Sequence, residues 1–492
     1  MRYDKLQPIS DLAGTIFGGF DVNTGMYDIS GKQLPGACDT TGAAPCIPGN
    51  GNLGAIPEGN HIGLAPCASY RCPINYNFGP HIGAAYSLDQ KTVIRGGYGL
   101  VYDEFAGFLQ DMADHVGNWP AAQTVFQSVN STLGQPITYL QGLQTLSAAP
   151  LPTAAPWGTL FWNADPKKQT PLSNQWNVEM QRQATKQLTV AIGYVGSSTH
   201  HLDYTGAGNQ AVHPSSGTQA QVEALRPWPG QGNVYFGRSI GVSSYNSLQV
   251  SANQRMTDGL QFLISYTWSK AIDNGASGFL ASENGPGGGG AGIQDYYHPN
   301  SNRGPSASNV PQFLSTSMIY QLPFGRGRRY LRSGPASWIV GGWQTNSIFS
   351  IRSGQPYSIL VNGDVANVGG TVYGIGYARA NLTGNPHLAH PTTAQWFNTA
   401  AYSVPVDSYG NSPRNSLTSD HVTQFDFSTF KRFPIWREGT YMEFRAEAFN
   451  VLNIINYGPP NNTQNAAGFG TVTSLLSGNP PRQLQFTLKL NF

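Results

Sequence analysis

Charged residues are scarce in this chain of 492 amino acids: they make up 11% of it, against about a quarter in a typical soluble domain. The chain has 28 Lys and Arg against 26 Asp and Glu, so its net charge of +2 is small. Its basic cluster, RGRR at 326–329, is too short to bind a nucleic-acid backbone. We therefore exclude nucleic acid as a partner. Glycine and proline are plentiful instead, with 59 and 34 residues, which favours an all-β protein with many turns.

Long apolar runs are also absent. No window of about 18 consecutive apolar residues occurs, which excludes a transmembrane helix. The N-terminal sequence MRYDKLQPISDLAG has no apolar core and cannot act as a signal peptide. We therefore expect either a cytosolic protein or the C-terminal part of an exported one.

Cysteine is rare, and its four residues form two pairs that are close in sequence, Cys38 with Cys46 and Cys67 with Cys72. We expect two local disulfides in an oxidising compartment. A zinc site built from all four thiolates is one alternative, although the seven residues between Cys38 and Cys46 make a wide gap for a zinc knuckle. Free thiols are the other alternative.

What the chain has in abundance is strict alternation of apolar and polar residues, which is typical of strands with two different faces. In the hairpin 245–270, Val250 and Tyr266 belong to the apolar sets of the two arms, and Asp258-Gly259 supplies the turn. Further hairpins repeat this plan at 78–103, at 175–196, between arms 313–329 and 338–351, and between arms 422–433 and 440–453, and the single strand RQLQFTLKLNF follows at 482–492.

The connections alternate in length. Short turns fall near residues 90, 186, 258, 329 and 436, and long Gly-, Pro- and Asn-rich connections fall at 103–173, 197–243, 271–311, 353–421 and 452–481. Outer-membrane barrels segregate their loops in this way, with short periplasmic turns and long extracellular loops. Strands of about ten residues also match the height of the hydrocarbon core. The sequence therefore predicts an all-β, antiparallel transmembrane β-barrel portion of about 11–12 strands in the bacterial outer membrane, with membrane lipid as a partner.

Three charged residues, Glu443, Arg445 and Glu447, share one face of the strand YMEFRAEAF. Consecutive members lie about 7 Å apart and the two glutamates about 13 Å, too far for the paired carboxylates of a glycosidase. We expect a structural charge ladder facing the barrel lumen, and a place on the ligand path is the alternative. No Ser-His-Asp order or G-x-S-x-G elbow stands out, so we expect no catalytic residues and no enzymatic activity.

Two other patterns favour surface loops over chemistry. The run GPGGGGAG at 285–292 lacks the Lys-Ser/Thr that follows a phosphate-binding loop. His200 with His201, and His387 with His390, are not on a helix that would align them as metal ligands. We therefore expect neither a cofactor nor a metal site.

Seven segments resemble, in order and spacing, the barrel of the Oar-like TonB-dependent outer-membrane transporters. They are VIRGGYGLVYD, SNQWNVEMQRQ, YNSLQVSANQR, ISYTWSKAIDN, YQLPFGRGRR, FRAEAFNVLN and RQLQFTLKLNF. The resemblance extends from about Phe78 onward, and GGFDVNTGMYDISG at 18–31 also resembles an upstream barrel segment. It implies a barrel of about 22 strands that is plugged by an N-terminal domain, energised through the TonB complex and used to import an extracellular ligand.

The chain departs from that family pattern, because it shows no signal peptide, carboxypeptidase-regulatory-like domain, TonB box or plug. We expect residues 1–75 to form an extracellular loop or upstream barrel segment, and residues 76–492 to form the C-terminal strands and loops, about half of the barrel. The leading hypothesis is part of an importer whose TonB contact lies in the missing N-terminal region. A non-transporting adhesin or scaffold barrel is the alternative, and a soluble secreted β-protein is a third possibility.

The last strand has the apolar side chains of Leu484, Phe486, Leu488, Leu490 and Phe492 on one face. The resemblance implies that such a terminal aromatic strand is recognised by the outer-membrane insertion machinery.

We predict that deleting Phe492 impairs insertion of the full-length parent, because the terminal aromatic then leaves the apolar face. The heat-modifiable fraction in isolated outer membranes measures the effect. Asn491→Ala, which keeps Phe492 in place, is the matched control. Normal assembly of the Phe492 deletion would count against this role for the last strand.

Overall fold

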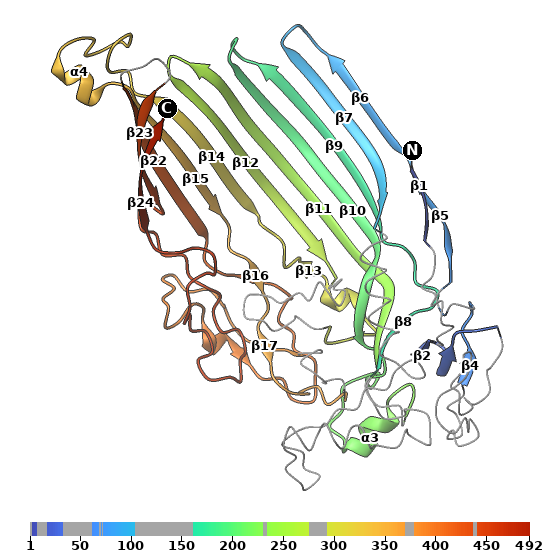
Figure 1. The fold of residues 1–492 in the computed structure, drawn as a ribbon. Coiled ribbons are helices and arrows are strands. Elements are labelled where there is room, and N and C mark those ends of the chain that lie inside the picture. The colour runs from blue at the N-terminus through green and yellow to red at the C-terminus, as the bar shows by residue number, and fades with distance from the viewer. Residues whose placement is uncertain are drawn as a thin grey trace, which may run out of the picture.

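A computed structural model of the chain describes residues 2–6, 17–32, 62–67, 70, 72–103, 161–229, 234–274, 293–369, 378–435 and 440–492. The expected turn near 436 and the glycine run 285–292 lie outside these ranges. A 13-stranded sheet, here called the wall, dominates the described part of the molecule (Figure 1). None of the helices in these ranges combines the length and the hydropathy of a membrane span.

The wall follows one continuous path from edge to edge. The strands, in order, are β6 (His81–Ser87), β7 (Thr92–Tyr102), β9 (Leu172–Gln183), β10 (Leu188–Ala207), β11 (Val234–Thr257), β12 (Leu260–Asp273), β14 (Gln312–Gln321), β15 (Trp343–Arg352), β22 (Val422–Pro434), β23 (Tyr441–Phe449) and β24 (Gln483–Asn491). The short strands β8 (Phe161–Ala164) and β13 (Gly304–Pro305) pair with β11 and β12 off this path. Each pair along the path is antiparallel, so the predicted fold class is confirmed.

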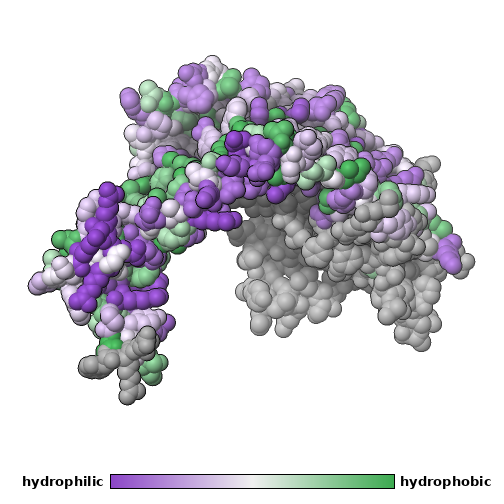
Figure 2. Space-filling view, turned by 90° about the horizontal axis from the view of Figure 1, so that it is seen from above, coloured by the Kyte–Doolittle hydropathy of each residue, from purple (hydrophilic) through white to green (hydrophobic). Residues whose placement is uncertain are grey.

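The wall is curved. Seen from the end that carries the short turns, the described residues form an arc that is open on one side (Figure 2). Strands β6 and β24 are the edges of the path, and in the described ranges each pairs with one neighbour in the wall. Such an arc of tilted, twisted strands has the geometry of part of a closed barrel.

The strand register gives the wall one continuous apolar face, because directly opposed residues of antiparallel strands lie on the same face. Val250 is opposite Ile192 on one side and Tyr266 on the other. The large exposed side chains of this apolar face include Ile82, Tyr86, Tyr98, Val178, Met180, Ile192, Tyr194, Leu248, Ile264, Trp268, Met318, Leu484, Phe486, Leu488 and Leu490. An exposed apolar surface that extends across the whole sheet matches a lipid environment.

The opposite, polar face carries small and polar side chains. Gln249 is opposite Gly193 and Thr267, and the pattern continues in the next rows. Exceptions include Leu263, Phe313 and Ile348, with exposed fractions of 46%, 41% and 57%. The alternation read from the sequence is therefore present across the wall.

The hairpin turn between β11 and β12 has the predicted chemistry. Asp258 and Gly259 have φ angles of 49° and 83°. Two successive positive φ angles match the twist of the flanking strands, and Asp-Gly is a favoured pair for this purpose.

Two sequence predictions about element limits are wrong. Residues 338–340, predicted as the start of a strand, belong to helix α4 (Pro335–Val340), which begins with a proline in its first turn. Gly342, with a φ of 77°, separates this helix from β15. The predicted long connection 197–243 is also shorter than expected, because β10 and β11 run 20 and 24 residues and pair as far as Ala207 and Tyr235.

Several small elements lie beside the wall or beyond its long-loop end (Figure 1). They are β1 (Arg2–Leu6) paired with β5 (Ile74–Gly79), the sheet of β2 (Gly18–Asp21), β3 (Met26–Ile29) and β4 (Ile62–Leu64), helix α3 (Gln219–Ala224), the 3-10 turns η2 (Pro299–Asn302) and η3 (Thr399–Ala401), and the pairs β16 (Pro356–Tyr357) with β21 (Leu417–Thr418), β17 (Leu360–Val361) with β18 (Ala378–Arg379), and β19 (Asn381–Leu382) with β20 (Tyr402–Ser403). The segment 18–31, which resembles an upstream barrel segment, thus forms a hairpin in a separate three-stranded sheet.

We predict that Val250→Arg destabilises the wall by roughly 2 to 4 kcal/mol in lipid, the cost of a charge near the middle of a lipid-facing strand. Gln249→Arg, one residue away on the polar face, is the matched control and has a much smaller effect. Urea titration of the chain refolded into phospholipid vesicles measures both. Equal losses in the two variants would contradict the assignment of the faces.

We predict that the β2–β3–β4 sheet loses stability as the pH rises. Asp28 is 6% exposed, and burial, together with the charge of Asp21, raises the pKa of its carboxyl to about 7. A raised pKa favours the folded state only while the carboxyl is protonated, so this contribution disappears between about pH 4 and pH 7.

Limited proteolysis within residues 17–32 checks this at pH 5 and pH 8. At each pH the cleavage rate of the native chain is divided by that of Asp28→Asn, a variant that has no charge to bury. This ratio is expected to be larger at pH 8 than at pH 5. A constant ratio of the two cleavage rates would show that Asp28 does not titrate in this window.

Candidate functional site

The long connections of the chain pack into a cap, defined here as the described residues of segments 17–32, 203–238, 293–310, 353–421 and 454–481. One of its cores joins the ends of β10 and β11 to the β2–β3 hairpin and to residues 293–297. Its fully or nearly fully buried members are Phe20, Tyr27, Ile29, Tyr204, Val234, Phe236, Ile293 and Tyr296. The Trp228 indole nitrogen donates a hydrogen bond of 3.0 Å to the Val22 carbonyl, which fixes the hairpin to this core.

A second core is formed by segment 353–421, with Phe469 of segment 454–481 packed against it. Phe397 is at its centre, with ring centroids 5.9 Å from Tyr402 and 5.1 Å from Phe469 in edge-to-face geometry. The remaining buried members are Tyr357, Ile359, Val361, Ala380, Ala401 and Leu417. This segment is therefore a packed structure built on short strand pairs.

Two buried arginines stabilise the cap: Arg414 connects it to the wall, and Arg379 joins two of its own segments. Arg414 forms an ion pair of 2.5 Å with Asp273, the last residue of β12, and both side chains are almost fully buried. Arg379 donates to the Asn302 side-chain oxygen at 2.6 Å and to the Ser412 carbonyl at 2.9 Å. The pKa of the Arg379 guanidinium is lowered to about 10, mainly by burial and to a smaller extent by the nearby charge of Arg414. Removing one partner of such a buried pair is strongly destabilising, so these contacts hold the cap in one position.

A cavity of about 430 Å³ opens in the cap where β15 ends and β22 begins. Trp396 and Phe397 provide aromatic surface, and Asp420, His421 and His387 provide polar groups. The Asp420 carboxylate lies 2.9 Å from Nδ1 of His421. Aromatic walls with a few polar groups form the usual lining of a small-molecule site.

The described residues contain no group of three or more His, Cys, Asp or Glu side chains that could hold a metal ion. His200 is 3.0 Å from the Ser198 hydroxyl, through Nε2. Asp203, which follows His201 closely in sequence, forms an ion pair of 3.0 Å with Lys168. The structure therefore does not assemble the histidines considered from the sequence into a ligand set.

The three charged residues of β23 form a connected chain of ion pairs on the polar face. Glu443 accepts from Arg432 Nε at 2.9 Å and from Arg445 Nη2 at 3.1 Å, and Arg445 Nη1 is 3.7 Å from Glu447. The Arg445 guanidinium also lies 5.2 Å from the centre of the Phe430 ring. The side chain of Glu443 is 10% exposed, but those of Arg432 and Arg445 are 59% and 38% exposed. Both guanidiniums can therefore reach a further partner.

The apolar residues of the last strand lie on the apolar face of the wall. Ala446 of β23 is opposite Phe486, and Ala448 is opposite Leu484. Leu484, Phe486, Leu488 and Leu490 are 56 to 69% exposed, and Phe492 is fully exposed.

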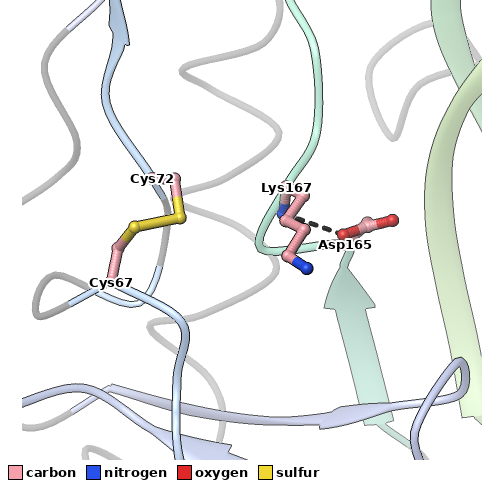
Figure 3. The surroundings of a disulfide bond; sticks show 4 residues. All are labelled: Cys67, Cys72, Asp165 and Lys167. Atoms are coloured by element: carbon pink, nitrogen blue, oxygen red, sulfur yellow. Dashed lines mark hydrogen bonds between the residues drawn. A yellow bond between two sulfur atoms is a disulfide. The ribbon is translucent and has the colours of Figure 1, made fainter.

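The structure describes one of the two cysteine pairs. Cys67 and Cys72 are joined by a disulfide with a Cα–Cα distance of 5.0 Å (Figure 3). The nearby loop is organised by Asp165, whose Oδ1 accepts a hydrogen bond of 2.8 Å from the Lys167 amide. Cys38 and Cys46 lie outside the described residues.

Sequence reasoning missed the cap and its cavity. The short strands of segment 353–421 are two residues long and carry no periodic pattern. The clearest available indication was the density of Tyr, Trp and Phe in connections that were expected to be loops, since aromatic residues dominate buried cores.

Comparisons with known proteins agree with the fold. The model of the family "Outer membrane beta barrel domain" matches residues 1–485. No curated protein matches the chain. Among solved structures, the outer membrane transporter YddB from Escherichia coli is 11% identical with a TM-score of 0.42, over 82% of this chain and 39% of that one.

Two other solved structures have similar values. The pyoverdine outer membrane receptor FpvA from Pseudomonas aeruginosa is 10% identical with a TM-score of 0.39, over 86% of this chain and 37% of that one. The FrpB iron transporter from Neisseria meningitidis is 9% identical with a TM-score of 0.35, over 83% and 38%. This chain thus spans less than two fifths of each of these proteins. Since the family model extends over nearly its whole length, the chain belongs to the outer membrane beta barrel domain family and resides in the bacterial outer membrane.

Proposed function

We propose that the chain is the C-terminal barrel portion of an Oar-like TonB-dependent transporter, which takes up an extracellular ligand through the outer membrane. The observation that carries this proposal is the contrast between the two faces of the wall. One face is mainly apolar, and the other is mainly polar and carries the ion-paired residues Glu443, Arg445 and Glu447. A polar inner face is required for a barrel that encloses water, a plug or a polar ligand.

The open edges support a larger barrel. Among the described strands, β6 and β24 each have one neighbour in the wall, and unpaired backbone groups at such an edge are costly in lipid. We infer that further strands of the parent protein pair with these edges to complete a barrel of about 22 strands. In this arrangement residues 76–492 are the C-terminal strands and loops, and residues 1–75 contribute to the extracellular side.

The charge ladder then faces the lumen. Glu443 is fixed between Arg432 and Arg445, so its charge is balanced within the wall. The partly exposed guanidiniums of Arg432 and Arg445 are left to contact the plug domain or a passing anionic group. The ladder therefore serves as a structural element of the lumen.

The cavity in the cap is the proposed first contact for the ligand. It lies at the long-loop end, which is the extracellular end when short turns are periplasmic. Trp396, His421 and Asp420 combine a flat apolar surface with hydrogen-bonding groups. Outer-membrane barrels of this family are normally not enzymes, and we assign the cavity to binding without chemistry.

We predict that deleting the parent gene abolishes uptake of a specific compound from the growth medium, and that deleting the gene for TonB abolishes uptake of the same compound. Energised transport requires both proteins. Mass spectrometry of spent medium measures which compounds persist. A compound that is still imported without TonB would overturn the energised mechanism. If no compound persists in the first strain, the chain is a non-transporting adhesin or scaffold.

Variants of the cap test the role of the cavity. Trp396→Ala in the parent is expected to slow uptake of that compound by about tenfold, the typical effect of removing one aromatic contact. Val406→Ala, at a residue that is 76% exposed and does not line the cavity, is the matched control. The amount of heat-modifiable barrel in the membrane is measured for both. An unchanged uptake rate for Trp396→Ala would remove the cavity from the ligand path.

A further inference from the structure

The connection between β14 and β15, residues 322–342, differs from the other short turns of the wall. It lies at the end opposite the cap and contains helix α4, which projects beyond the strands (Figure 1). Its sequence LPFGRGRRYLRSGPASWIVGG contains four arginines and no Asp or Glu. Arg326, Arg328, Arg329 and Arg332 are all exposed. We call residues 322–342 the α4 loop.

The α4 loop also exposes large apolar side chains. Trp338 and Ile339 of the helix are 60% and 73% exposed, and Val340 is 38% exposed. Tyr330 and Leu331, which lie among the arginines, are 50% and 46% exposed. Exposed apolar side chains on a short helix, with basic side chains in the turn that precedes it, are the combination found in segments that lie in a membrane interface.

Two residues of the wall fix α4 at the border of the apolar face. Lys431 and Trp343 are opposite each other on that face, and the Trp343 ring lies 6.2 Å from the Phe444 ring in edge-to-face geometry. The Lys431 ammonium donates to the carbonyls of Trp338 and Ile339, and the Trp343 indole nitrogen donates to the Ile339 carbonyl at 2.9 Å. The helix is therefore attached to the lipid-facing side of the wall, at its short-turn end.

We propose that the α4 loop binds the anionic phospholipids of the leaflet that borders the short turns. Trp338, Ile339 and Val340 enter the boundary between headgroups and acyl chains, where tryptophan is favoured. The arginines are on the same loop, so they reach the phosphate groups of that leaflet, with which guanidinium forms paired hydrogen bonds.

The charge of the loop argues for lipid as its occupant. The loop has no acidic side chain to neutralise its four arginines, and it borders the surface that already faces lipid. Each basic residue near an anionic membrane surface contributes severalfold to the affinity. The other short turns with cationic side chains, such as those of Lys91, Lys186 and Arg255, have no such helix beside them among the described residues.

Lipid retention by the full chain in detergent micelles tests the proposal. Native mass spectrometry compares phosphatidylglycerol with phosphatidylcholine of the same acyl chains. The native chain is expected to retain phosphatidylglycerol in preference. The triple variant Arg326→Gln, Arg329→Gln and Arg332→Gln is expected to lose this preference by about tenfold or more.

The matched control is the triple variant Lys91→Gln, Lys186→Gln and Arg255→Gln, which removes the same charge from other short turns and keeps the preference. A second variant, Trp338→Ser with Ile339→Ser, is expected to weaken retention of both lipids and leave their ratio unchanged.

The unmodified chain provides a test that does not depend on the folding of a variant. Raising the salt concentration before analysis is expected to reduce its preference for phosphatidylglycerol, because salt screens exposed charges. Equal preferences in the two triple variants, or a salt-independent preference in the native chain, would overturn the proposal and leave the α4 loop as a surface for a protein partner.

Discussion

The cross-strand ladder of backbone hydrogen bonds is the constraint on which the rest of this structure depends. In lipid no water is present to pair with backbone groups, so each strand must pair with its neighbours along its whole length. The register of the wall meets this requirement row by row, as in the row that joins Ile192, Val250 and Tyr266. Because side chains alternate between faces, the same register sorts them into an apolar and a polar surface. The low content of charge follows, since half of each strand must be apolar.

The wall has little interior of its own, and the buried cores lie in the cap. There the aromatic residues pack as in a soluble domain, as Phe397 does between Tyr402 and Phe469. The extension of β10 and β11 beyond the other strands supplies the base on which one of these cores is built. The ion pair between Arg414 and Asp273 then joins the cap to the wall. The connection 353–421 is thereby held in one arrangement, which the cavity that its residues line requires.

Local pattern was sufficient to predict the wall and insufficient to predict the cap. The apolar sets around Val250 and Tyr266 and the turn at Asp258-Gly259 are encoded within a few residues, so the hairpins and their two faces follow from the sequence. The exact strand count and the registers do not. Arg414 and Asp273 are separated by 141 residues, and no periodicity marks such a pair. The predicted start of a strand at residues 338–340 is wrong because apolar composition alone does not distinguish a strand from a short helix. Residues 338–340 have a strand-like composition, but the proline before them and the glycines after them favour a helix. The sequence shows that Glu443, Arg445 and Glu447 share one face of a strand, whereas the ion pair of Glu443 with Arg432 depends on the register with β22.

Lys431 shows how the wall accommodates a residue that its own pattern forbids. By parity it belongs to the apolar face, where a charge in the middle of the bilayer would cost roughly 2 to 4 kcal/mol. It is placed at the short-turn end of β22, among the rings of Trp343 and Phe433, and its ammonium reaches the carbonyls at the end of α4. The carbonyls of the helix thus accept hydrogen bonds from the Lys431 ammonium, and these bonds hold the helix on the lipid-facing side of the wall. This break in the alternation therefore positions a short helical segment at the membrane border, which the strands alone could not provide.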